Sequence, residues 1–416
     1  MEMEYRLTAR EYWDEAALDR NLKQAFDICN GCRLCHDLCP SFPALFRFVE
    51  DLDDEVERLT RSQMETVAEE CFQCKICALK CPYTPPHRFD LDFPRLMLRT
   101  KAQRVRRVGL SADDRFLGNP ERSGGWGTAL SPLANWAARR PGVRRVLAQR
   151  TGIDPRRRLP PYAGRRFSRR VAGRPVPPSP DVVLFATCTT EYSYPAVGEA
   201  AVRVLEHQGL SVATLPGERC CGMPALDGGD AVGAQERAHA NLAALAPHVA
   251  RGARVVALQP TCAYVLKREY PLMVDGDVAR DVAAAVVDVT ELLAELVQQG
   301  KLADDFQREV GPVTYHVSCH TRMEGGGPRG RRVLSKIPGT TVTVVEACAG
   351  IDGTWGLKAR HYDAAQHVAA RLISALAERP GDLPCSDCKL AGLQIQVAGQ
   401  APLHPVEVLD RAYGLS

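Results

Sequence analysis

Two copies of one short cysteine motif stand near the start of this 416-residue chain. In each copy the spacing is C-x2-C-x2-C-x3-C, and proline follows the last cysteine directly. The eight thiols are Cys29, Cys32, Cys35, Cys39, Cys71, Cys74, Cys77 and Cys81. This spacing is typical of thiolates that ligate [4Fe–4S] clusters. The duplication therefore predicts two cubane clusters, whose chemistry is the transfer of single electrons.

The two copies are expected to exchange one ligand each. In ferredoxins with this pattern, three thiolates of a motif bind one cluster and the fourth binds the other. The pattern implies one cubane on Cys29, Cys32, Cys35 and Cys81, and another on Cys71, Cys74, Cys77 and Cys39. A zinc site and free structural thiols are the alternatives.

The elements around the two motifs are predicted to be helices. Residues 1–28 carry an irregular apolar stripe, and residues 48–70 are charged at helical spacing. Thirty-one residues separate Cys39 from Cys71, more than a minimal bacterial ferredoxin uses. Two cysteine loops held between helices indicate an α-helical ferredoxin domain over residues 1–100.

The second half of the chain repeats itself and predicts two lobes, residues 179–300 and 301–416. Buried apolar strands are expected at residues 181–187, 211–215 and 254–258, with counterparts near 313–318, 341–346 and 385–388. Amphipathic helices separate them, for example at 196–208, 233–249 and 362–378. Strands that alternate with helices indicate duplicated α/β lobes with parallel sheets.

A cysteine follows almost every predicted strand of these lobes. The lobe thiols are Cys188, Cys220, Cys221 and Cys262 in the first lobe, and Cys319, Cys348, Cys385 and Cys388 in the second. The carboxyl ends of parallel strands lie at one edge of a sheet, where such folds place their ligands. Four thiols can bind a further [4Fe–4S] cluster or a tetrahedral zinc. Buried cysteines without a ligand are the alternative.

The positive charge of the chain is concentrated in residues 101–178, which we expect to link the domains and to dock. Residues 101–174 hold eighteen Arg and one Lys against four acidic residues, although the whole chain carries only +3. Arginine pairs alternate there with short apolar stretches, a combination that suits an anionic membrane surface or an acidic partner protein. No nucleic-acid-binding fold accompanies the charge, so nucleic acid is not an expected partner. A solvated proline-rich linker is the alternative.

The start of the chain is acidic and no signal-peptide core follows it. No apolar run approaches the roughly 18 residues of a transmembrane helix. We therefore expect the thiols to serve metals in a reducing cytoplasm. Attachment would be peripheral, on the inner face of the cell membrane.

The lobes resemble the cysteine-rich CCG domains of heterodisulfide reductase, because both contain Cys…Cys-Cys-Gly…Cys. With the tandem motif in front, and with residues 260–271, 316–320 and 404–409, the chain is similar to the iron–sulfur subunit family of anaerobic glycerol-3-phosphate dehydrogenase. The resemblance implies a flavoprotein dehydrogenase partner that oxidises a small organic substrate. It also implies that this chain relays the electrons towards membrane quinone without substrate chemistry of its own.

The lobes depart from heterodisulfide reductase in their cysteine count. Its catalytic lobes use five cysteines, whereas each lobe here retains four, with Ala349 in place of the second cysteine of a pair. The first lobe lacks a closing C-x-x-C. A disulfide-cleaving cluster is therefore not the first expectation. A heterodisulfide or thiol reductase, or a peroxide-defence enzyme with a cluster in the lobes, is the alternative function.

Overall fold

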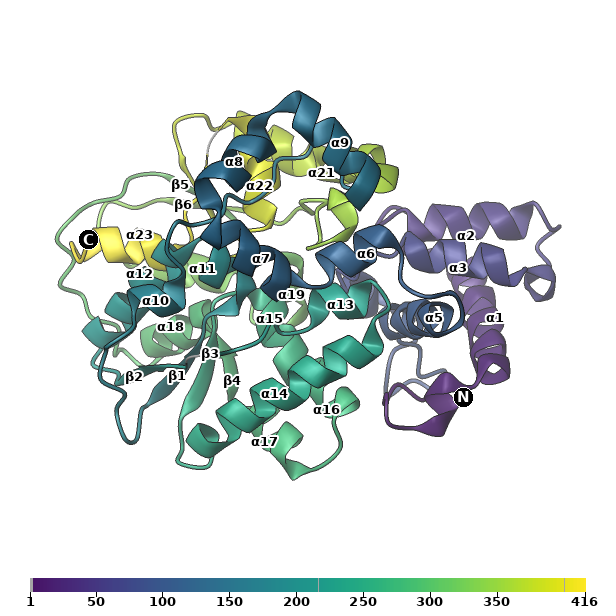
Figure 1. The fold of residues 1–416 in the computed structure, drawn as a ribbon, viewed down its shortest axis with the longest axis horizontal. Coiled ribbons are helices and arrows are strands. Elements are labelled where there is room, and N and C mark those ends of the chain that lie inside the picture. Colours follow the sequence, from purple (N-terminus) through teal and green to yellow (C-terminus); the bar gives the residue numbers. More distant parts are fainter. Residues whose placement is uncertain (1–2, 216, 400) are drawn as a thin grey trace.

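A computed structural model of the chain describes residues 3–215, 217–399 and 401–416. Met1 and Glu2, with which the predicted first domain begins, lie outside the described residues. The helices of the first domain stand at one end of the molecule and the two α/β lobes occupy the rest (Figure 1). The predicted fold class, a helical ferredoxin-like domain before two α/β lobes, is confirmed.

Five helices build the first domain around a core of aromatic side chains. They are α1 (Glu15–Cys32), α2 (Ser41–Glu50), α3 (Arg61–Glu69), α4 (Ile76–Lys80) and α5 (Phe93–Val108). Asp14 caps the start of α1, and its carboxylate accepts hydrogen bonds from the backbone amides of Ala16 and Ala17. Phe42 of α2 and Phe93 of α5 stack with their ring centroids 4.7 Å apart, and Phe26 of α1 packs beside Phe93. This core therefore fixes the helices that carry and flank both cysteine motifs.

The basic middle segment is helical rather than extended. Its helices are α6 (Ala112–Leu117), α7 (Pro120–Ala129), α8 (Ser131–Arg139), α9 (Pro141–Thr151) and α10 (Phe167–Arg170). Helices α7 to α9 each begin with proline in the first turn, where its missing amide donor costs nothing. The boundary predicted at residue 100 falls inside α5, so the first domain and the middle segment share a continuous helix.

Each lobe is built on a small parallel sheet. The first contains β1 (Val182–Phe185), β2 (Val212–Thr214), β3 (Arg254–Ala257) and β4 (Val286–Asp288), in the order β2-β1-β3-β4. The second contains β5 (Val313–His316), β6 (Val342–Val345) and β7 (Leu383–Ser386), in the order β6-β5-β7. A single parallel bridge between Cys385 and Leu403 stands where the first lobe has its fourth strand. The two sheets therefore have the same topology, as the predicted duplication requires.

Helices cover both sheets and the intervals between strands. In the first lobe they are α11 (Thr187–Tyr192), α12 (Pro195–His207), α13 (Met223–Asp227), α14 (Ala231–Val249), α15 (Pro260–Tyr264), α16 (Tyr270–Met273), α17 (Asp277–Ala285) and α18 (Val289–Gln298). In the second they are α19 (Cys319–Met323), α20 (Arg329–Leu334), α21 (Tyr362–Ala377), α22 (Ala391–Ile395) and α23 (Pro405–Ala412). One apolar cluster, which includes Leu184 of β1 and Tyr315 of β5, joins the lobes. No helix in the described parts of the chain is long and apolar enough to cross a membrane.

The repeat extends to the way in which the last helix of each lobe begins. Asp288 caps α18 and His404 caps α23, and in both cases the residue three positions later is a glutamate that bonds back to the cap. Such reciprocal capping satisfies two amide donors that the helix would otherwise leave free. His404 is fully buried, and its Nδ1 accepts the amide of Val406 at 3.2 Å.

We expect His404 to make folding stability depend on pH. Burial, together with the charge of Lys389, lowers the pKa of His404 to about 3. Because the unfolded histidine titrates near 6.5, below that pH the unfolded state binds a proton that the folded state does not. The free energy of unfolding should therefore fall by about 1.4 kcal/mol per pH unit through this residue as the pH drops below 6.5.

The variant His404→Asn isolates this contribution, because asparagine also caps helices but does not titrate. The free energy of unfolding, measured with urea between pH 6.5 and 4.5, should depend less steeply on pH in the variant. The difference should be about 1.4 kcal/mol per pH unit. Equal slopes in the two proteins would mean that His404 does not remain neutral in the folded state.

Candidate functional site

The eight motif thiols fall into two groups. Burial and the neighbouring thiols Cys81, Cys35 and Cys32 raise the pKa of Cys29, so these four side chains lie within electrostatic reach of one another. We call this set the outer thiols. The pKa of Cys77 is raised by burial and then by Cys74, Cys71 and Cys39, with a smaller effect from Cys35. Cys39, Cys71, Cys74 and Cys77 are the inner thiols. This grouping supports the exchange of Cys39 and Cys81 between motifs.

The backbone of both loops curls in a way that suits a large ligand. Arg33, Gln73 and Lys75 have positive φ values of 51°, 54° and 63°, which ordinary residues adopt only in tight turns. Two hydrogen bonds end on sulfur: the Gln73 side-chain amide donates to Cys71 Sγ at 3.3 Å, and the Tyr83 backbone amide donates to Cys81 Sγ at 3.4 Å. Donors aimed at sulfur are among the groups that tune the potential of an iron–sulfur cluster.

The chemistry of this donor set fits iron–sulfur clusters, whose usual protein ligands are thiolates. A zinc site needs its sulfur ligands about 2.3 Å from one centre, whereas a cubane spreads its ligands over four iron corners. Burial raises the pKa of Cys35 to about 11. Cluster binding must therefore displace protons from such thiols.

The outer and inner loops differ in their surroundings. Leu34 in the outer loop is 58% exposed, whereas Lys75 in the inner loop is 2% exposed. The Lys75 ammonium lies 3.7 Å from the carboxylate of Glu269 in the first lobe. The outer thiols thus lie near the surface at the end of the molecule, and the inner thiols face the lobes.

A cavity of about 90 Å³ lies where the inner loop meets both lobes. We call it the thiol cavity, because eight cysteines line it. They are Cys74, Cys188, Cys220, Cys221, Cys262, Cys319, Cys348 and Cys388. It therefore contains one inner thiol, all four lobe thiols of the first lobe and three of the second.

The carboxyl ends of the strands deliver these side chains, as predicted. Cys188 follows β1 as the second residue of α11, Cys262 lies in α15 after β3, and Cys319 begins α19 after β5. Cys385 is different, because it lies within β7 and is buried in the apolar cluster that joins the lobes. Cys319 neighbours both Cys348 and Cys388, and it also raises the pKa of Cys74.

Two features of the thiol cavity suit a bound metal or cluster. The sulfurs of Cys188 and Cys220 lie 3.9 Å apart, and their hydrogen bond together with burial raises the pKa of Cys188 well above its ordinary value. His320 is buried, its Nδ1 pairs with the Thr261 hydroxyl at 3.1 Å, and its Nε2 has no hydrogen-bond partner among the described residues. Burial lowers the pKa of His320 to about 3, so its imidazole is neutral.

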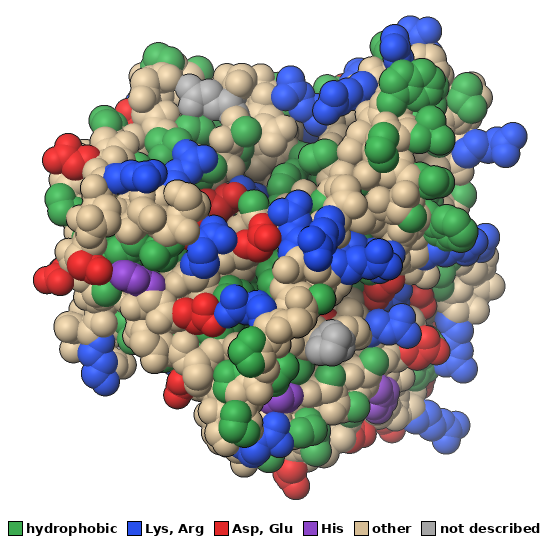
Figure 2. Space-filling view, turned by 60° about the vertical axis from the view of Figure 1, so that its left-hand side comes forward, with side chains coloured by type: hydrophobic (Ala, Val, Ile, Leu, Met, Phe, Trp, Pro, Cys, Tyr) green, Lys and Arg blue, Asp and Glu red, His purple; other side chains and the backbone are tan. Residues whose placement is uncertain are grey.

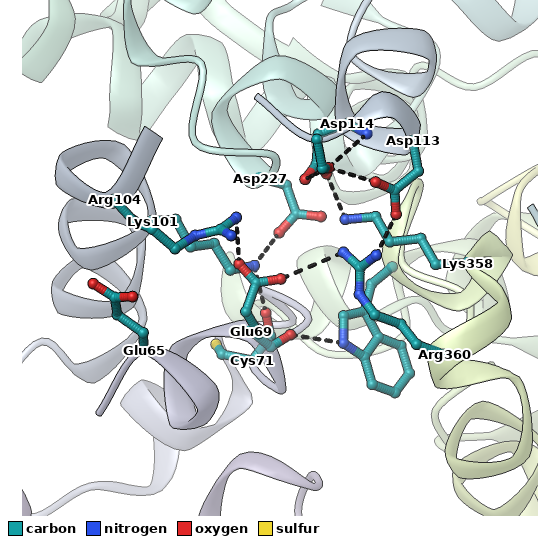
Figure 3. Close-up of polar contacts among 12 residues, drawn as sticks. Glu65, Glu69, Cys71, Lys101, Arg104, Asp113, Asp114, Asp227, Lys358 and Arg360 are labelled. Carbon is teal, nitrogen blue, oxygen red and sulfur yellow. Dashed lines mark hydrogen bonds and ion pairs between the residues drawn. The ribbon is translucent and has the colours of Figure 1, made fainter. Parts of the chain in front are cut away.

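A network of buried charges surrounds the inner loop (Figure 3). Lys101 of α5 donates to the carbonyl oxygen of Cys71 at 3.0 Å and to the carboxylate of Asp227 at 2.8 Å. Burial alone would lower the pKa of Lys101, but the charges of Asp227 and Glu69 outweigh it and raise the pKa. A permanent positive charge therefore lies against the backbone of an inner thiol.

The same network ties the second lobe to the middle segment. Lys358 pairs with Asp114 of α6 at 2.5 Å, and Arg360 bridges Asp113 and Glu69. The indole of Trp355 donates to the carbonyl oxygen of Glu69 at 3.0 Å. Four segments far apart in the sequence are thus fixed around the inner thiols.

Sequence reasoning did not identify Gln73, Lys75, Lys101 or Asp227 as parts of the site. Gln73 and Lys75 could have been selected from the sequence, because they lie in the short gaps between the cysteines of the second motif. Lys101 and Asp227 could not, because they are 126 positions apart and meet only in the folded chain.

Comparisons with known proteins match both halves of this architecture. Residues 22–107 match the Citrate utilization protein B Fer4-like domain, and residues 182–267 and 313–395 each match the cysteine-rich CCG domain. The chain is 28% identical over 396 residues to a subunit of the anaerobic glycerol-3-phosphate dehydrogenase of Escherichia coli (strain K12). That alignment covers 84% of this chain and 99% of the relative.

Two further relatives share part of the chain. Lactate utilization protein A of Geobacillus kaustophilus (strain HTA426) is 32% identical over 186 residues, 42% of this chain and 74% of that protein. A subunit of the fumarate reductase (CoM/CoB) of Methanothermobacter marburgensis is 26% identical over 247 residues, 57% of this chain and 47% of that protein. The chain belongs to the family of iron–sulfur electron-transfer proteins that join a Fer4-like domain to paired CCG domains, with the anaerobic glycerol-3-phosphate dehydrogenase subunit among its members.

Proposed function

We propose that this chain carries electrons from a flavoprotein dehydrogenase through two [4Fe–4S] clusters and the lobes towards a membrane quinone. Cys29, Cys32, Cys35 and Cys81 would hold the outer cluster, and Cys39, Cys71, Cys74 and Cys77 the inner one. Iron supplies the change of oxidation state when the clusters are bound. The chain supplies the thiolate ligands of the clusters, buries the clusters and places fixed charges around them.

One observation carries the proposal: Cys74 is an inner thiol and also lines the thiol cavity. The inner cluster would therefore lie next to whatever the lobes bind. The outer loop, with Leu34 exposed, is the part of the relay that a partner protein can approach. Electrons would enter at the outer cluster and leave through the lobes.

The thiol cavity also suits a second candidate function, the reduction of a disulfide or thiol substrate. Seven lobe thiols surround one space, with Cys188 and Cys220 in sulfur contact. The two functions differ in what leaves the cavity: electrons alone in the relay, and a reduced substrate in the reductase.

Anoxic reduction experiments with the full iron-loaded chain distinguish them. A partner flavoprotein with its substrate should bleach the visible absorption of the clusters, and a disulfide substrate should not restore it. Restoration by disulfides at a catalytic rate would favour the reductase. Clusters that the flavoprotein cannot reduce would refute the relay.

Helices α7 to α9 are the proposed membrane-docking surface. Trp126, Leu133 and Trp136 are 69%, 60% and 50% exposed, and the Arg140 guanidinium lies 5.4 Å from the centre of the Trp136 ring. Figure 2 shows Lys and Arg side chains among hydrophobic side chains at the upper right of the molecule, at the height where Figure 1 places α8 and α9. Exposed aromatic and aliphatic groups with basic neighbours are typical of helices that lie on anionic lipid.

We expect Leu133→Ser with Trp136→Ser to weaken binding to anionic vesicles at least tenfold. Each side chain would lose about 1.5–3 kcal/mol of apolar burial in the lipid. Co-sedimentation with phosphatidylglycerol vesicles measures the loss. Val232→Ser with Val278→Ser is the matched control, since both valines are exposed on the first lobe at 59% and 53%. Equal binding of the two double variants would exclude α8 as the docking helix.

A further inference from the structure

A second cavity, of about 330 Å³, lies between the middle segment and the lobes. We call it the apolar pocket. The middle segment lines it with α6, α7, α8 and α9, and the lobes line it with α11, α13 and the segments after β6 and β7. Its apolar lining residues include Phe116, Leu117, Ala138, Leu147 and Ile153. The pocket has room for a ring-sized ligand with an apolar body.

The inner end of the apolar pocket adjoins the thiol cavity. Six residues line both spaces: Cys188, Thr189, Pro224, Gly353, Thr354 and Leu390. Helix α7 is fixed against this junction, because the carboxylate of Glu121 accepts the backbone amide of Cys220 at 3.0 Å. A ligand in the apolar pocket would therefore lie beside Cys188 of the first lobe.

The outer end opens on the proposed docking surface. Phe116 and Leu147 line the apolar pocket and are also 42% and 39% exposed. They belong to α6 and α9, the helices that precede and follow α7 and α8 in the chain. A ligand dissolved in a membrane could thus reach the pocket without crossing water.

Two tyrosines stand among the mainly apolar lining of the pocket. Burial raises the pKa of Tyr192 to about 12, so its phenol keeps its proton at neutral pH. Its ring packs directly on Gly124 of α7, where an added Cβ would lie 2.4 Å from the ring. Tyr162 packs in the same way on Gly127. The two glycines therefore leave room for the rings of Tyr162 and Tyr192, which both line the pocket.

We propose that the apolar pocket binds the ring of a lipophilic quinone, with its tail directed towards the membrane. The proposal rests on the proposed function and names the place where the relay ends. Such a ligand needs an apolar enclosure, donors for its carbonyl oxygens, a route from lipid and a redox group beside it. The quinone would take two electrons, supplied one at a time by the relay from the reduced flavin of the partner, and two protons from water. The product is the quinol.

Calorimetric titration of the full iron-loaded chain with decylubiquinone in detergent tests the proposal. This probe has no free ring position with which a thiol could react. We expect saturable binding, weakened at least tenfold by Ala138→Phe, which fills the pocket from α8. Val232→Phe is the control, since Val232 is 59% exposed on α14 and belongs neither to the lining nor to the docking helices; its affinity should equal that of the unaltered chain.

Tyr192→Phe keeps the ring and removes only the phenol oxygen, so it tests the site without filling it. A several-fold weaker affinity is expected. Absence of quinone binding, or equal affinities in Ala138→Phe and Val232→Phe, would overturn the proposal. Displacement of the quinone by an equal concentration of a short-chain phospholipid, with no effect of Tyr192→Phe, would identify a lipid-chain pocket instead and also overturn it.

The failure of this inference differs from the failure of the relay. If the partner flavoprotein still reduces the clusters, and ferricyanide still reoxidises them, a chain that binds no quinone loses only the proposed exit. If the flavoprotein cannot reduce the clusters, the relay itself is wrong, whatever the apolar pocket binds.

Discussion

Replacing Cys39 by alanine is expected to remove the inner cluster and to leave the outer cluster intact. Cys39 belongs to the first motif, but burial and then Cys71 of the second motif raise its pKa. The variant should lose about four irons per chain. It should also lose the electron paramagnetic resonance signal of the cluster nearest the lobes.

Cys81→Ala is the matched variant, and it should have the opposite effect. Cys81 belongs to the second motif and neighbours the outer thiols. Its loss should remove the outer cluster, and the flavoprotein should then be unable to reduce the chain. If each variant instead lost the cluster of its own motif, the ligands would not be exchanged.

Lys101→Met should be among the most damaging single substitutions outside the thiols. Lys101 and Asp227 form a buried ion pair, with 4% and 3% of their side chains exposed. Removing the ammonium leaves the carboxylate buried without its partner, which costs about 3–5 kcal/mol. Urea unfolding of the iron-loaded chain measures the loss. The inner cluster should also become harder to reduce, because a positive charge near Cys71 has gone.

Two further variants separate the ion pair from a simple loss of packing. Lys101→Met combined with Asp227→Asn removes both charges and should recover most of the stability. Arg280→Met removes an exposed partner of Asp277 and should change stability by less than about 1 kcal/mol. A double variant as unstable as Lys101→Met alone would show that the pair is not the cause.

Spacing along the chain was sufficient to predict the local parts of this site. Cysteines a few positions apart must share a loop, so the two motifs could be read directly. Thiols placed after apolar strands had to meet at the edge of a parallel sheet, and Cys188, Cys262 and Cys319 do so. The helix caps at Asp288 and His404 are equally local, since each pairs with a glutamate three positions later.

The remaining parts depend on packing between distant segments. The thiol of Cys385 was expected beside Cys388, but a strand alternates its side chains, and β7 directs Cys385 into the core. The arginine and proline content of residues 101–178 was also compatible with a solvated linker. Helices α6 to α9 instead cover the lobes, held by partners such as Lys358 that lie more than 200 positions away.

Iron, acid-labile sulfide and zinc analysis of the anoxically purified chain, with electron paramagnetic resonance of its reduced form, tests the central claim most directly. Two cubanes require about eight irons per chain and two interacting cluster signals. A count near twelve would place a further cluster among the lobe thiols. A colourless protein that holds zinc, or no metal, on Cys29–Cys39 and Cys71–Cys81 would contradict the account.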